Sequence, residues 1–207
     1  MPEKTNAPAP PRASARPGAP GLGRRLLRLA CYGVLALAIW GAWPLLPPIA
    51  KTPFYALRLA LKPAPETLPV PVQGVPPAAL ADTWGAPRGN GRRHEGIDIF
   101  APRGRPVLSA TEGIVTRKGS SPLGGNIVWV MGPGRQMHYY AHLDRHGSVE
   151  PGDRVQAGTP LGTVGNTGNA RGTPPHLHYG IYQAGGAINP YPLLRNPPVP
   201  AQPGPVQ

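Results

Sequence analysis

The sequence of 207 residues has little cysteine, little acidic charge and few aromatic side chains. Its single cysteine, Cys31, excludes an intrachain disulfide and any zinc site built from several thiolates. No lysine follows Lys118, which excludes a carrier domain that displays a modifiable lysine at a hairpin tip. No stretch after Thr67 has a convincing helical period, so we expect the C-terminal part of the chain to be built from strands.

Proline and glycine, by contrast, are abundant, with 32 and 28 residues respectively. Such a proportion indicates chain that is rich in loops or non-globular. Residues 1–25 form a basic segment rich in proline and alanine, and residues 196–207 form a proline-rich tail. Neither segment can bury a core, so both are predicted to be disordered.

An uninterrupted apolar run lies between residues 29 and 50, where 22 uncharged and mostly apolar residues follow one another. This is about the length that crosses a hydrocarbon core of roughly 30 Å. The segment before the run contains one acid, Glu3, and six basic residues, namely Lys4, Arg12, Arg16, Arg24, Arg25 and Arg28. We therefore predict a transmembrane signal anchor over residues 26–50, with a cytoplasmic N-terminus and an exported C-terminal domain. A cleaved signal peptide, with Ala36-Leu37-Ala38 as its site, is the alternative.

Residues 51–77 are predicted to be a juxtamembrane segment and a proline-rich linker. Within it, Thr52 to Lys62 can form a short amphipathic helix, with Phe54, Leu57 and Leu61 on one face, or an ordinary spacer. Pro63 to Pro77 is the predicted semi-rigid linker. Residues 1–65 hold nine of the 21 basic residues and one of the nine acids. Because topology explains most of the net charge of +12, no nucleic-acid partner is predicted.

Residues 78–195 are predicted to form one all-β domain, a small antiparallel barrel or sandwich. Short runs rich in valine and isoleucine are bounded by glycine, proline, asparagine or aspartate; they cover Pro106–Ala110, Gly113–Arg117, Asn126–Met131, Arg154–Gln156 and Pro160–Val164. The glycine-rich stretch from Gly162 to Gly172 is either a cleft wall or a flexible connector.

Two short motifs carry side chains that bind zinc, namely His94 and Asp98 in H-E-G-I-D, and His176 and His178 in H-L-H. Alternate residues of a strand share a face, so the H-L-H pair can point into one cleft. Four extended residues would separate His94 and Asp98 by roughly 13 Å, too far to share an ion. We therefore expect the chain to bend between them at Gly96, which lacks a Cβ atom.

A third motif, M-H-Y-Y-A-H-L, covers Met137–Leu143. On a regular strand His138, Tyr140 and His142 would share one face, and Met137, Tyr139 and Ala141 the other. The order of H-E-G-I-D, Y-A-H-L and P-H-L-H resembles the lysostaphin-like (LytM-type) zinc metallopeptidases, which cut peptide bonds in bacterial peptidoglycan. The resemblance extends from about Leu68 to Arg195 and includes G-A-P-R and G-N-T-G-N-A-R-G-T-P-P-H-L-H-Y-G.

This resemblance implies the lysostaphin-like fold and one Zn²⁺ per domain, held by His94, Asp98 and His178. It also implies that His142 and His176 are two unliganded catalytic histidines. We assign His176 to water activation and His142 to stabilisation of the tetrahedral species, although these two roles could be exchanged. The implied substrates are stem-peptide cross-links of peptidoglycan, reached from the inner membrane in the periplasm, or after signal cleavage as a secreted periplasmic protein.

Two features of the sequence leave alternatives open. Glu95 follows a histidine as in helical H-E-x-x-H proteases, but position 98 is aspartate and Gly96 disfavours a helix, so we predict a solvent-facing residue. The tyrosine that some family members carry shortly before the first ligand is missing between Ala81 and Arg93.

The alternative function is a catalytically inert wall-binding module that activates another hydrolase. No residue from the matched motifs corresponds to His138 or His146, which are predicted to lie on the surface.

Overall fold

The computed structural model describes residues 22–42 and 48–196, in two units that divide after Pro47. The first unit contributes one helix, α1 (Leu22–Ala42), and the second contains α2 (Pro48–Leu61), α3 (Tyr191–Arg195) and every strand. Neither α1 nor any other helix within the described ranges has both the length and the apolar character needed to span a bilayer. The predicted anchor over 26–50 includes residues 43–47, which lie outside the described residues, as do 1–21 and 197–207 of the predicted tails.

Nine strands form one antiparallel sheet in the described part of the second unit. They are β1 (Ile97–Phe100), β2 (Pro106–Leu108), β3 (Gly113–Ser121), β4 (Gly125–Met131), β5 (Met137–His146), β6 (Arg154–Val155), β7 (Pro160–Val164), β8 (His176–Gln183) and β9 (Gly186–Ile188). Single turns of 3-10 helix are η2 (Pro77–Ala79), η3 (Gly89–Gly91), η4 (Pro133–Arg135) and η5 (Gly168–Ala170). The predicted strands and the mostly β character are confirmed, while α3 is a short helix that the sequence pattern missed.

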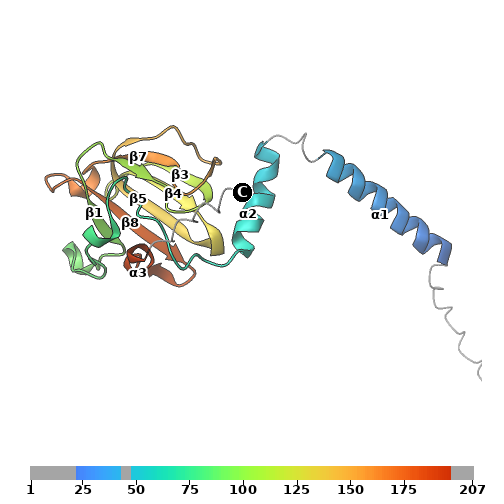
Figure 1. Ribbon diagram of the computed structural model, residues 1–207, viewed down its shortest axis with the longest axis horizontal. Coiled ribbons are helices and arrows are strands. Elements are labelled where there is room, and N and C mark those ends of the chain that lie inside the picture. Colours follow the sequence, from blue (N-terminus) through green and yellow to red (C-terminus); the bar gives the residue numbers. More distant parts are fainter. Residues whose placement is uncertain (1–21, 43–47, 197–207) are drawn as a thin grey trace, which may run out of the picture. The chain divides into compact units, whose positions relative to one another are not determined.

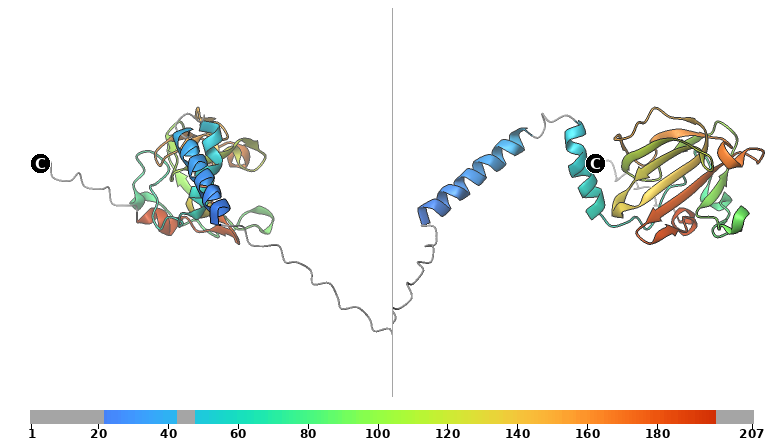
Figure 2. Two further views of the ribbon diagram at one scale, coloured as in Figure 1. Left: turned by 90° about the vertical axis from the view of Figure 1, so that its right-hand side faces the viewer. Right: turned by 180° about the vertical axis from the view of Figure 1, so that it is seen from behind.

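The main path of the sheet runs β1-β8-β5-β4-β3-β6, with β9 beside β8 and with β7 pairing both β2 and β5 (Figure 1). Figure 2 shows the same strands from behind. Strand β8 therefore lies between β1 and β5, although about eighty residues separate β1 from β8 in sequence. The H-E-G-I-D, Y-A-H-L and H-L-H motifs are carried on or next to three adjacent strands.

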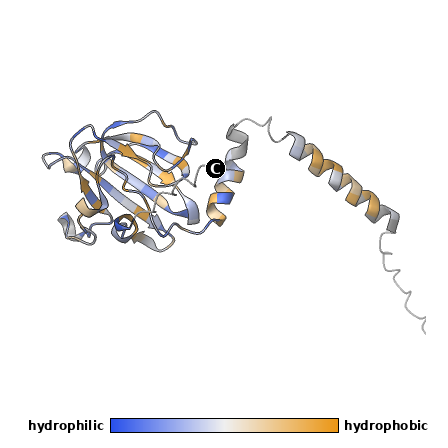
Figure 3. Cartoon of the chain, in the orientation of Figure 1, coloured by the Kyte–Doolittle hydropathy of each residue, from blue (hydrophilic) through white to orange (hydrophobic). Residues whose placement is uncertain are grey.

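Side-chain alternation gives the two faces of these strands different roles, and apolar and hydrophilic segments alternate along them (Figure 3). Ile97 and Ile99 of β1 pack in the core with Leu177 and Tyr179 of β8. The residues between them, which include Asp98, point to the other face. One face of β1, β8, β5 and β4 thus builds the core, and the opposite face carries the polar side chains of a cleft.

The proline-rich segment before the domain is part of the core, which corrects its prediction as a linker over residues 63–77. Leu68 and Val72 are buried in the central cluster, and the Leu68 N–H donates to the carbonyl of Leu193 at 2.8 Å. The Leu108 N–H donates to the Pro71 carbonyl at 2.9 Å. Proline fixes φ in an extended range, so a proline-rich strand-like segment can place alternate apolar side chains against a sheet.

Helix α2 packs beside the sheet, against η4 and β3 (Figures 1 and 2). Leu59 is fully buried there, whereas Phe54, Leu57 and Leu61 are exposed. Glu112, in the turn before β3, accepts hydrogen bonds from Lys62 and Tyr55. The predicted short amphipathic helix is present, and it belongs to the same unit as the sheet.

Candidate metal centre and active-site cleft

The register of β1 and β8 brings the first candidate ligands together. Asp98 of β1 lies directly opposite His178 of β8 in the antiparallel pair, and both side chains leave the same face of the sheet. His94 precedes β1 and is turned back toward Asp98 by a bend at Gly96. A Cβ atom at Gly96 would lie 2.5 Å from the Tyr179 carbonyl oxygen and 2.8 Å from Cε1 of His178. The glycine predicted at this bend is therefore required mainly because β8 approaches it so closely.

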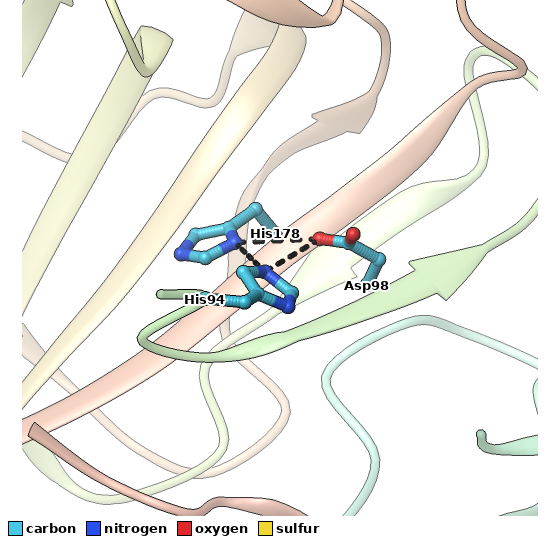
Figure 4. A group of neighbouring side chains, drawn as sticks. All are labelled: His94, Asp98 and His178. Carbon is cyan, nitrogen blue, oxygen red and sulfur yellow. Dashed lines mark hydrogen bonds and ion pairs between the residues drawn. The ribbon is translucent and has the colours of Figure 1, made fainter. Parts of the chain in front are cut away.

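Three potential ligand atoms form a small triangle (Figure 4). His94 Nε2 lies 2.8 Å from His178 Nδ1 and 3.1 Å from Asp98 Oδ1, and His178 Nδ1 lies 3.3 Å from the same carboxylate oxygen. A tetrahedral zinc ion with bonds of about 2.0 to 2.1 Å separates its ligand atoms by roughly 3.3 Å. The spacing and the donor types therefore fit a divalent zinc ion. Among the described residues, His94, Asp98 and His178 are the histidine and carboxylate side chains whose ligand atoms lie close enough together to hold one metal ion.

Hydrogen bonds hold two of these ligands in a binding orientation. His94 Nδ1 lies 2.7 Å from the Thr83 carbonyl oxygen, which can only accept, so Nδ1 carries the proton and Nε2 keeps its lone pair for a metal. The hydroxyl of Thr83 accepts from the Asp98 N–H at 3.0 Å. Arg88 donates to the second carboxylate oxygen of Asp98, Oδ2, at 2.5 Å. This pairing leaves Oδ1 as the oxygen that faces the two histidines.

The electrostatics of the centre favour ligands in their metal-binding protonation states. Burial alone would raise the pKa of the Asp98 carboxyl, but the interactions of this carboxylate with His178 and His94 outweigh burial and hold the pKa well below its ordinary value. Burial lowers the pKa of His178, which keeps the imidazole neutral. A metal requires a deprotonated carboxylate and neutral imidazoles, and the pKa shifts of Asp98 and His178 favour these two states.

His142 joins the centre through a break in strand geometry. Its φ of 63° lies in the left-handed region, and the register of β5 against β4 shifts nearby, between Asn126 and Val128. The His142 N–H donates to the Gly124 carbonyl at 2.7 Å. The regular alternation is therefore interrupted, and His142 follows Ala141 onto the cleft side. A left-handed non-glycine residue costs about 1 to 3 kcal/mol and is often found at functional sites.

This break corrects the predicted face of the M-H-Y-Y-A-H-L strand. His138 and Tyr140 are fully buried on the core side, and Nδ1 of His138 lies 2.7 Å from the hydroxyl oxygen of Tyr179. The prediction that His138 lies on the surface is wrong, because its ring is buried in the core, where the Tyr179 hydroxyl is its hydrogen-bond partner. His146 is half-buried, with Nε2 at 3.0 Å from the Gly119 carbonyl oxygen.

His142 and His176 form a pair of imidazoles next to the three candidate ligands. Their ring centroids lie 5.1 Å apart, and Nε2 of His176 lies 3.9 Å from Asp98 Oδ1. Nδ1 of His142 lies 2.9 Å from the Thr167 carbonyl oxygen, and Nδ1 of His176 lies 2.9 Å from that of Pro174. A carbonyl oxygen only accepts, so both rings carry a proton on Nδ1, and the neutral tautomer of each ring has its lone pair on Nε2. Burial lowers the pKa of His142 to about 4, which keeps this ring neutral at pH 7.

All five of these side chains line one cleft of about 860 Å³. Asn169 and Ala170 of the glycine-rich stretch line one wall, together with Thr173 and Pro174 just after it, so of the two alternatives the structure favours the cleft wall. Thr167 anchors it, because its hydroxyl accepts from the Asn126 N–H and donates to the Leu143 carbonyl, each at 2.9 Å. Glu95 is exposed at the mouth of the cleft, as predicted, although it precedes β1 rather than lying on a strand.

Sequence reasoning missed several residues of the cleft. Four aromatic side chains line it, namely Phe100, Trp129, Tyr139 and Tyr182. The rings of Trp129 and Tyr139 stack at 4.3 Å, and Tyr139 lies 5.8 Å from the His178 ring. Strand alternation predicts that Tyr182 shares a face with His178, and this signal was present in the sequence. Arg88 lies in the G-A-P-R motif, but its ion pair with Asp98 follows from tertiary structure. No sequence signal identifies Thr83.

Comparison with known proteins places these residues in a family. Peptidase family M23 matches residues 92–190, a range that includes all five histidine and aspartate side chains of the centre. The chain is 41% identical over 125 residues to the L-Ala--D-Glu endopeptidase of Bacillus subtilis (strain 168), covering 55% of this chain and 38% of that protein. It is 38% identical over 88 residues to the peptidoglycan DD-endopeptidase ShyC of Vibrio cholerae serotype O1, covering 42% of this chain and 20% of that protein.

A solved structure agrees with the sequence relatives. The catalytic domain of the antimicrobial peptidase lysostaphin from Staphylococcus simulans superposes with a TM-score of 0.51 at 33% identity, covering 56% of this chain and 91% of that domain. The chain thus spans well under half the length of the two curated relatives, and most of the lysostaphin catalytic domain. The matched range, the antiparallel sheet and the motif order agree, and the chain belongs to Peptidase family M23, the LytM-type metallopeptidases.

Proposed function

We propose that this protein is a zinc-dependent endopeptidase that hydrolyses peptide cross-links of bacterial peptidoglycan. Two relatives support the proposal at the level of the family, one named as a peptidoglycan DD-endopeptidase and the other as an L-Ala--D-Glu endopeptidase. The observation that carries it is the convergence of five groups in one cleft, namely three metal-type ligands and two imidazoles with free Nε2 atoms. An inert wall-binding module has no need for this complete set, so that alternative is not favoured.

In this proposal His94, Asp98 and His178 hold one zinc ion. When bound, zinc polarises the scissile carbonyl and lowers the pKa of a coordinated water to about 7. The chain contributes a fixed triangle of donor atoms, with Thr83 and Arg88 orienting two of the ligands. Partners of this kind typically change metal affinity about 10- to 100-fold when they are removed.

His176 and His142 would then move the protons of the reaction. Both rings have Nδ1–H bound to a carbonyl oxygen, so each Nε2 begins as a proton acceptor. We assign His176 to the deprotonation of the attacking water, since its Nε2 lies nearer to the candidate metal ligand Asp98. His142 in its neutral form cannot donate from Nε2. Its stabilisation of the tetrahedral species therefore follows uptake of the proton that His176 removes from the water, and His142 next passes this same proton to the leaving amine.

We also propose that the enzyme acts outside the cytoplasmic membrane, where peptidoglycan lies. The six basic residues before the apolar run over 29–50 support an N-terminus that is retained in the cytoplasm. Protease added to spheroplasts should remove the catalytic unit if the proposed topology is right, and complete protection would contradict it. N-terminal sequencing separates an anchored chain from one that is cleaved and starts near Ile39.

The enzymatic proposal is tested with purified full-length protein and isolated cell-wall sacculi that contain direct stem-peptide cross-links. We expect chelator-sensitive release of soluble muropeptides, with mass spectrometry showing a cut within the peptide and restoration of activity by added zinc. A zinc-loaded, folded protein that releases no muropeptide and stimulates a separate wall hydrolase would instead support the inert module.

A further inference from the structure

We propose that the hairpin of residues 85–93 is a carboxylate-binding subsite of the cleft. It would make the enzyme prefer stem peptides that carry a free carboxylate near the scissile bond over the same peptides in amidated form. This inference rests on the proposed endopeptidase function and adds the chemistry by which the cleft selects its substrate.

The hairpin is joined directly to the metal centre. Two backbone hydrogen bonds join its arms: the Gly85 N–H donates to the His94 carbonyl, and the His94 N–H donates to the Ala86 carbonyl, each at 2.9 Å. Near the tip, the Arg88 N–H donates to the Arg92 carbonyl at 2.9 Å. Because one arm ends at the candidate ligand His94, a group bound by this hairpin is held at a defined position relative to the reacting bond.

Three arginines of the hairpin line the cleft, and two of them are available to a ligand. Arg88 is engaged with Asp98 at 2.5 Å. Arg92 Nε donates to the Gly89 carbonyl at 3.3 Å, and Arg93 Nη1 to the Gly85 carbonyl at 3.1 Å. Both side chains are exposed, and each guanidinium has five N–H donors, so these single bonds tether the groups while leaving most donors open.

The acidic groups of the cleft do not neutralise these two arginines. The carboxylates that line it are Asp98, which is paired with Arg88, and Glu95, which interacts with Tyr182. Within residues 48–196, no ion pair joins Arg92 or Arg93 to an acidic side chain. This end of the cleft therefore has an excess of positive charge.

A planar guanidinium matches a carboxylate with two parallel hydrogen bonds, which gives both attraction and orientation. A stem-peptide carboxylate can use these donors, whereas the corresponding carboxamide has no charge and only one acceptor oxygen. An uncharged oligoglycine bridge would gain nothing from the two arginines. The hairpin thus supplies a physical reason for selecting anionic peptides.

The test uses the full chain loaded with zinc and two cross-linked muropeptides that are identical except that one stem-peptide carboxylate is replaced by a carboxamide. We expect kcat/KM to be about fivefold higher for the carboxylate form, the scale of an exposed ion pair, and the preference to shrink in high salt. In the double variant Arg92→Gln, Arg93→Gln the ratio of the two kcat/KM values should fall to near one. Because both substrates are measured on one preparation, the ratio does not depend on the fraction of folded enzyme.

Arg145→Gln is the matched control, because its side chain is 84% exposed outside the cleft lining, and it should keep the wild-type ratio. Equal cleavage of both muropeptides by the wild-type enzyme would overturn the inference, as would a preference that persists in the double variant. If neither is cleaved, the proposed function fails. Calorimetric binding of the same two muropeptides then tests the subsite separately, and equal affinities would overturn it.

Discussion

Gly96 offers a sharp test of how the fold builds the metal centre. The Cβ atom of an alanine at this position would lie 2.5 Å from the backbone oxygen of Tyr179 and 2.8 and 3.0 Å from ring atoms of His178. Cβ contacts below 3.0 Å are essentially absent from proteins, so β1 and β8 must separate by about half an ångström at the point where Asp98 faces His178. Relief by a flexible side chain is excluded, because the nearest atom is backbone.

We expect Gly96→Ala to lower the free energy of unfolding by about 2 to 3 kcal/mol, the upper part of the range of roughly 1 to 3 kcal/mol for an overpacked site, because the nearest clash is with backbone. For a unit of this size, that change corresponds to a melting temperature roughly 5 to 10 °C lower. Zinc affinity should fall about tenfold or more, because the displaced strand carries His178 away from the ligand triangle. Denaturant unfolding of the metal-free protein and calorimetric zinc titration measure the two effects separately.

Gly119→Ala is the control, since a Cβ atom at that position in β3 meets nothing within 4 Å. It should leave both stability and zinc affinity close to those of the wild-type protein. If Gly96→Ala behaves like this control in both measurements, the close approach of β8 to the bend does not hold the ligands in place, and the argument from packing is refuted.

Three further predictions test separate parts of the structure. Leu59→Ala should lower the free energy of unfolding in urea by about 2 to 5 kcal/mol, because this fully buried side chain packs α2 against the sheet. Leu57 is 56% exposed, so Leu57→Ala should cost little, and equal costs for the two variants would contradict the packing of α2. Thr83→Val should weaken zinc binding about tenfold in a competition titration, because the Asp98 N–H loses its acceptor, and Thr83→Ser should not. Burial lowers the pKa of His138 from 6.5 to about 4, so the unfolded chain binds a proton that the folded chain rejects, and stability should fall as pH drops from 6.5 to 4. The pH dependence of the melting temperature should be shallower in His138→Asn, and an identical slope would show that this histidine does not contribute.

Much of the site was predictable because strand periodicity and ligand chemistry are local properties. The alternation in H-L-H correctly placed His176 and His178 on one face, and the impossible extended span between His94 and Asp98 correctly demanded a bend at Gly96. The direct opposition of Asp98 and His178 was not predictable, since register is set by pairing between distant strands.

The errors have equally specific causes. His142 itself has a left-handed backbone conformation next to a register shift, and this turns its side chain into the cleft. The alternation rule for a regular strand contains no such break, and it therefore placed His142 on the same face as the buried His138. The proline-rich segment near Leu68 and Val72 was interpreted from its composition as a linker, whereas its alternating apolar side chains fill the core. Thr83 acts through one hydroxyl and one carbonyl, which no sequence pattern distinguishes from those of any other threonine.

The most direct test of the account measures zinc content and muropeptide release together in the wild-type protein, Asp98→Ala and His176→Ala. We expect one zinc per chain with release in the wild type, loss of both in Asp98→Ala, and one zinc without release in His176→Ala. Zinc retained at full stoichiometry in Asp98→Ala, or undiminished hydrolysis by His176→Ala, would contradict the division of this cleft into metal ligands and free imidazoles.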